Sequence, residues 1–78
     1  MMHSLKIDKQ YLENLLSGRK KAEVRINDRD YQLGDILEFY NPYPAEKYVY
    51  FKITHIHSGL GMEGIYVVLS VEQTEDPK

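Results

Sequence analysis

Positive charge is concentrated in one short stretch of this chain, GRKKAEVR, which runs from Gly18 to Arg25 and contains one acid, Glu23. Its four cations stand out because the formal net charge of the whole chain is only -2 at pH 7. A guanidinium binds phosphates and carboxylates through paired hydrogen bonds. A carboxylate in a desolvated cleft accepts from a base amino group or acts as a general base. The stretch therefore predicts a ligand-facing strand.

Lys20 and Glu23 each have two interpretations that the residues leave open. Lys20 follows a predicted helix, where a cation interacts favourably with the helix dipole by about 0.3 to 1 kcal/mol. Alternatively, its ammonium turns toward Glu23 and Arg25 and contacts a phosphate or a developing oxyanion. Glu23 belongs either to a surface ion pair of about 0 to 1 kcal/mol or to a desolvated ligand site.

The segment NDRDYQLGD, from Asn27 to Asp35, is rich in turn-forming residues and predicts a structured loop after this strand. Asp28 and Asp30 are suited to closing Asx turns, with Arg29 paired to them. In the functional interpretation, Arg29 instead extends the positive rim of the cleft.

Other spacings give weaker signals. His55 and His57 have the i, i+2 spacing of two metal ligands on a strand, but no third ligand is near and the chain has no cysteine. We therefore expect no metal site and no cofactor, with His55 partly buried. The glycine-rich SGLGMEG lacks the lysine of a P-loop. Tyr40 and Tyr43 are candidates for stacking on an exposed base.

The hydrophobic pattern predicts the elements that position these residues. A helix is expected over residues 9–17, with Asp8 as its N-cap, Gly18 directly after its end, and an apolar stripe formed by Tyr11 and three leucines. Five strands are expected, the first around Leu5 and Ile7 and the others over residues 22–26, 36–40, 48–57 and 65–71. In residues 22–26, Glu23 and Arg25 share one face.

The expected fold is α+β, mostly β: a small closed or nearly closed barrel of about five strands with one main helix packed against it. Residues 1–78 form one domain, in which residues 72–78 are expected to be a loose tail. The sequence has no apolar run long enough to span a membrane and no signal peptide, so we expect a soluble, cytoplasmic protein. The low net charge favours local recognition over a long phosphate track.

Gly18, Lys20, Glu23 and Arg25 form the pattern G-x-K-x-x-E-x-R, which resembles the signature of ASCH domains, relatives of the RNA-binding PUA domains. The segments NDRDYQLGD and GIYVVLSVE are similar to short prokaryotic and phage ASCH-like proteins of unassigned function. This resemblance implies a PUA-like β-barrel whose cleft lies beside the helix and is lined by the motif residues. It also implies RNA as a ligand.

One branch of very small ASCH domains resembles amidohydrolases that deacetylate N4-acetylcytidine. Lys20 matches the lysine of that branch, whereas Glu23 stands where the branch has a threonine. We therefore expect an RNA- or modified-nucleoside-binding domain that uses Gly18, Lys20, Glu23, Arg25 and Arg29. The alternatives are such an amidohydrolase, with Lys20 and Glu23 as its catalytic residues, and a protein-interaction module. In the binding interpretation, Arg25→Ala abolishes binding with little loss of stability.

Overall fold

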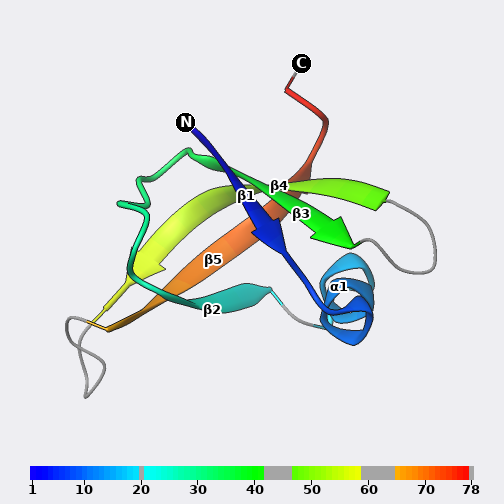
Figure 1. Ribbon diagram of the computed structural model, residues 1–78, viewed down its shortest axis with the longest axis horizontal. Coiled ribbons are helices and arrows are strands. Elements are labelled where there is room, and N and C mark those ends of the chain that lie inside the picture. The colour runs from blue at the N-terminus through cyan, green and yellow to red at the C-terminus, as the bar shows by residue number, and fades with distance from the viewer. Residues whose placement is uncertain (20, 42–46, 59–64, 78) are drawn as a thin grey trace.

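The computed structural model describes residues 1–19, 21–41, 47–58 and 65–77. They form a strongly curved sheet with one helix at one end (Figure 1). In chain order the elements are β1 (Met2–Lys6), α1 (Lys9–Leu16), β2 (Ala22–Ile26), β3 (Ile36–Asn41), β4 (Lys47–His57) and β5 (Tyr66–Thr74). Within the described ranges, no helix has the length and apolar character that crossing a bilayer requires.

The five strands form one sheet in the order β1-β3-β4-β5-β2. β1 runs parallel to β3, and each of the other neighbouring pairs is antiparallel. The sheet curls into a half-barrel whose two edge strands, β1 and β2, border its open side. The predicted class, α+β and mostly β with one helix against a small barrel, is confirmed.

Helix α1 begins and ends close to where the sequence predicts. The side chain of Asp8 accepts a hydrogen bond from the Gln10 backbone N–H at 2.8 Å, as an N-cap does. Gly18 follows the C-cap with φ +81°, a left-handed conformation that favours glycine. Leu12 and Leu15 are buried, whereas Tyr11 is 55% exposed and does not join the apolar stripe.

The hydrophobic core fills the concave side of the half-barrel, and the buried leucines of α1 close one end of it. Phe39 on β3 and Phe51 on β4 meet at its centre, with ring centroids 5.7 Å apart in an edge-to-face arrangement. The buried apolar residues are Leu5, Ile7, Leu12, Leu15, Tyr31, Leu37, Phe39, Val49, Phe51, Ile53, Val67, Leu69 and Val71.

The predicted partial burial of His55 was wrong, because β4 contains a register shift. Ile53 pairs with Val71, but His55 pairs with Ser70, so two positions along β4 match one position along β5. This bulge interrupts the alternation of the strand and leaves His55 exposed. Ile56, the next residue, is partly buried against the core.

The loose tail was predicted to begin at residue 72, which is too early. β5 continues to Thr74, and its last residues pair with β4 through Glu72 opposite Lys52 and Thr74 opposite Tyr50. The apolar pattern ends at Val71, but the longer β4 offers backbone hydrogen-bond partners beyond that point. Backbone pairing therefore extends the strand where the hydrophobic pattern does not.

Candidate functional site

The polar face of β2 is the one that points into the half-barrel. Glu23 is only 5% exposed, whereas Val24 and Ile26 on the other face are 53% and 56% exposed. The two predicted faces of this strand are confirmed, but burial is the reverse of the usual arrangement for an amphipathic strand. β2 is an edge strand, so its inward face meets the open side of the half-barrel.

Glu23 and Arg25 form a close ion pair on this inward face. Glu23 Oε2 accepts from Arg25 Nη2 at 2.8 Å and from Arg25 Nε at 3.1 Å. Arg25 Nη2 also approaches the backbone oxygen of Lys6 at 3.3 Å, and its guanidinium carbon lies 5.7 Å from the ring centroid of Phe39. Arg25 therefore connects β2 to β1 and β3 across the open side.

A pocket of about 440 Å³ opens beside this ion pair, and we call it the Glu23 pocket. Its wall combines the inward side of β2 with the end of β1 and the start of α1. The exposed ring of Tyr11 and the side chain of Lys6 supply an aromatic and a cationic group to this wall. The lining residues are Lys6, Ile7, Asp8, Tyr11, Glu23, Val24 and Arg25.

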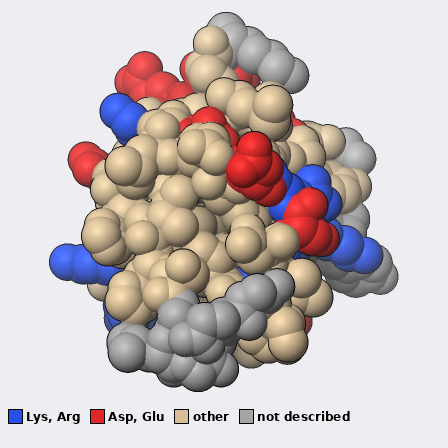
Figure 2. All heavy atoms as spheres, turned by 90° about the vertical axis from the view of Figure 1, so that its left-hand side faces the viewer, with Lys and Arg blue, Asp and Glu red and all other residues tan. Residues whose placement is uncertain are grey.

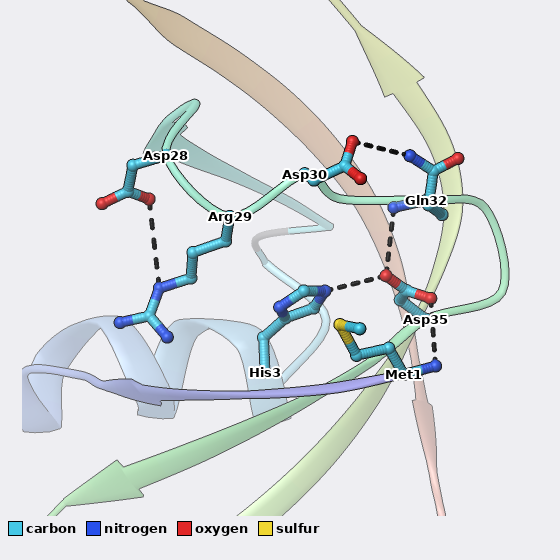
Figure 3. Close-up of polar contacts among 7 residues, drawn as sticks. All are labelled: Met1, His3, Asp28, Arg29, Asp30, Gln32 and Asp35. Carbon is cyan, nitrogen blue, oxygen red and sulfur yellow. Dashed lines mark hydrogen bonds and ion pairs between the residues drawn. The ribbon is translucent and has the colours of Figure 1, made fainter.

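A second pocket, of about 280 Å³, is lined partly by the segment between β2 and β3, and we call it the Tyr66 pocket. Arg29 reaches it, with its Nε 3.9 Å from Asp28 Oδ1 and both side chains largely exposed (Figure 3). The lining residues are Leu5, Val24, Arg25, Ile26, Asp28, Arg29, Tyr31 and Tyr66.

Asp35 fixes the segment between β2 and β3. Its carboxylate contacts His3 Nε2 at 2.8 Å, the Gln32 backbone N–H at 3.1 Å and the Met1 ammonium at 3.3 Å (Figure 3). Burial raises the pKa of Asp35, but the hydrogen bonds from His3 and Gln32 and the Met1 ammonium together outweigh it, so the pKa lies below its ordinary value. The segment is thus held in place at its C-terminal end.

Tyr31 lies where this segment meets β1. Its ring contacts the imidazole of His3 edge to face, with centroids 4.8 Å apart. Burial raises the pKa of the Tyr31 phenol, and the positive charges of Arg25 and Arg29 partly counter that rise. Both arginines line the Tyr66 pocket together with Tyr31.

Charged side chains are sparse in the middle of one face of the molecule. Figure 2 shows the side on which the segment between β2 and β3 lies in Figure 1, and its lysines, arginines and acids gather near the margin. On the described part of this face, the positive side chains therefore form no continuous track.

The structure brings Glu23 and Arg25 together in one pocket and places Arg29 in the neighbouring one. Gly18 ends the helix and is absent from the lining of both pockets. Lys20 lies outside the described residues.

Among the lining residues that were not predicted as site residues are one cation, Lys6, and three aromatic residues, Tyr11, Tyr31 and Tyr66. Lys6, Tyr11 and Tyr66 come from other elements of the chain, and Tyr31 comes from the segment that follows β2. The excess of tyrosine was the only sequence signal that could have found three of them.

The remaining predictions for polar and aromatic residues have mixed outcomes. Arg29 is paired loosely with Asp28, while Asp30 adopts φ +48° and accepts from Gln32 Nε2 at 2.9 Å. Tyr40 stacks on Tyr48 with centroids 5.0 Å apart, and Tyr43 lies outside the described residues. Among the described residues, no group of three histidine or acidic side chains is placed to hold a metal ion.

The fold and the site define a small half-barrel domain with a polar pocket on its open side. Residues 2–71 match a family model described as a domain of unknown function, DUF3850, and the chain belongs to this family. A relative in Escherichia phage P2, the "Uncharacterized 12.9 kDa protein in GpA 3'region", is 42% identical over 36 residues. That match covers 46% of this chain and 33% of the phage protein.

Proposed function

We propose that this protein binds RNA or a modified nucleoside by accepting a base in the Glu23 pocket. The observation that supports this most is a carboxylate, 5% exposed, in the wall of a pocket of about 440 Å³. A volume of this size is typical of small-ligand sites. The few polar groups in the wall of such a pocket fix the orientation of a ligand, because its donors and acceptors must face them.

Each lining group has a distinct role in this proposal. A carboxylate offers about four lone-pair positions, so Glu23 is able to accept from an exocyclic amino group while it stays paired with Arg25. Tyr11, 55% exposed, provides a ring on which a base stacks. Lys6 and Arg25 supply positive charge for a phosphate or a base carbonyl.

The similarity to ASCH and PUA-like domains supports the same ligand class, since its pattern includes Glu23 and Arg25 and both line this pocket. The motif also includes Lys20, whose part in binding rests on the sequence. In this proposal Gly18 ends the helix before the motif, and Arg29 acts in the neighbouring Tyr66 pocket.

An amidohydrolase that acts on an N4-acetylated cytidine is the second candidate, favoured by the burial of Glu23 in a pocket wall. Glu23 would activate a water molecule for attack on the acetyl carbonyl, and Lys20 would stabilise the oxyanion. The products would be acetate and cytidine. This candidate requires the same pocket, so one set of ligands tests both functions.

The test is a titration of the isotope-labelled protein, followed by NMR, with the four common ribonucleosides and N4-acetylcytidine. We expect shifts of β2 and α1 amides with at least one nucleoside. Glu23→Gln should weaken binding about 10-fold or more, because an amide NH₂ replaces one carboxylate oxygen. Glu72→Gln, on the exposed part of β5, is the matched control. Thermal unfolding confirms that both variants are folded at the titration temperature.

Acetate release from N4-acetylcytidine separates the two candidates. Release that is lost in Lys20→Ala would establish the enzyme, and binding without release would establish the binding domain. If none of the five nucleosides shifts the amides of β2 or α1, nucleoside recognition by this pocket is refuted.

A further inference from the structure

The Glu23 pocket and the Tyr66 pocket share part of their walls. Val24 and Arg25 line both of them, and these residues are neighbours on the edge strand β2. The two pockets therefore adjoin one another along β2, and together we call them the groove. A ligand in the first pocket has a second binding position directly beside it.

The second position has the chemistry of a base-stacking site. Tyr66 is 45% exposed and lines this pocket together with Ile26, its partner in the β2–β5 register, so its ring is open to a ligand. Leu5 and Tyr31 add buried apolar surface to the same pocket. Many proteins that bind single-stranded nucleic acid use a solvent-exposed aromatic ring of this kind as a platform on which a base stacks.

Two guanidiniums lie beside this position. Arg25 lines both pockets, and Arg29 lines the Tyr66 pocket. Arg29 is 45% exposed, and its Nε is 3.9 Å from Asp28 Oδ1, too far for a hydrogen bond. Both arginines line this pocket together with Tyr31. Planar guanidiniums bind phosphate oxygens through paired hydrogen bonds.

We infer that the groove binds two successive nucleotides of single-stranded RNA, with one base in each pocket and the connecting phosphate at Arg25 and Arg29. This inference rests on the proposed function and narrows its ligand from a nucleoside to a dinucleotide segment. The two pockets along β2 offer two base positions, so we expect recognition of two nucleotides.

The experiment compares ligands of increasing length that carry the same base. Dissociation constants are measured for the best-binding nucleoside, for the dinucleoside monophosphate built from it, and for the corresponding trinucleotide. We expect the dinucleotide to bind about 5- to 100-fold more tightly than the nucleoside, the range that stacking of one base gives. The trinucleotide should bind about as tightly as the dinucleotide.

Substitutions in the Tyr66 pocket test whether its residues cause the gain in affinity for the dinucleotide. Tyr66→Ala should return the affinity for the dinucleotide to about that for the nucleoside and leave the nucleoside unaffected, whereas Tyr66→Phe keeps the ring and the affinity. Arg29→Ala should weaken dinucleotide binding and reduce the salt dependence by about one phosphate contact. Lys52→Ala, an exposed cation on β4 outside both pockets, is the control for loss of charge.

The possible outcomes distinguish failure of this inference from failure of the proposed function. Binding of the nucleoside with no gain for the dinucleotide overturns the inference and leaves the proposed function in place. A gain that Tyr66→Ala leaves unchanged also overturns it, because the second base would then lie elsewhere. If neither ligand binds, the proposed function fails together with the inference.

Discussion

Replacement of Arg25 by alanine should destabilise the fold as well as weaken ligand binding. The sequence pattern predicts little loss of stability for Arg25→Ala, because it indicates that Arg25 is an exposed ligand contact. In the structure its guanidinium is paired with a buried carboxylate, contacts the backbone of β1 and lies against Phe39. Arg25→Ala leaves the Glu23 carboxylate without these two charge-assisted hydrogen bonds and removes a connection across the open side of the half-barrel.

The size of the effect follows from the burial of the two partners. The Glu23 side chain is 7% exposed and the Arg25 side chain 24%. Breaking a fully buried pair by removing one partner costs about 3 to 5 kcal/mol, and hydrogen bonds to charged groups contribute about 1.5 to 3 kcal/mol. Because Arg25 is partly in contact with water, we expect a loss of about 2 kcal/mol. For a domain of this size, that lowers Tm by about 8 to 16 °C.

Thermal and urea unfolding of Arg25→Ala, followed by circular dichroism, measure this loss. Arg19→Ala is the matched control, since Arg19 is exposed and its side chain donates only to Asn14 Oδ1 among the described residues, at 3.3 and 3.4 Å. Its loss should stay under about 0.5 kcal/mol. The double variant Glu23→Gln, Arg25→Ala should recover part of the stability, because it no longer buries a carboxylate that has lost the Arg25 guanidinium. A Tm of Arg25→Ala within about 2 °C of the unaltered protein would refute the structural role.

Two further predictions concern the elements around the site. The lowered pKa of Asp35 stabilises the fold above the ordinary carboxyl pKa of 3.8, and this contribution is lost as the pH falls through the still lower folded-state pKa. Asp35→Asn should therefore reduce the free energy of unfolding more at pH 7 than at pH 3 in urea titrations, and equal losses at both would contradict the assignment. Gly18→Ala should cost about 1 kcal/mol, because φ is +81° there although nothing lies within 4 Å of an added Cβ. A thermal melt that is unchanged in Gly18→Ala would show that the helix ends differently.

Local sequence patterns determined most of the elements. The N-cap Asp8 and the left-handed Gly18 limit α1, and alternating residues predicted each of the five strands within a few positions. These signals are local, because capping and side-chain alternation involve residues that are near one another in the chain. They failed where pairing with a distant strand decided the outcome, as in the bulge before His55 and the extension of β5 to Thr74.

The sequence by itself also determined which residues of the GRKKAEVR stretch share a face, and that Glu23 and Arg25 are close enough to pair. Only the tertiary structure decided that this polar face is buried, because burial of β2 depends on its place at the edge of the half-barrel. The pockets required the same information. Tyr11 and Tyr66 line these pockets from elements far apart in the chain, and no local pattern encodes how a sheet curls to bring them to β2.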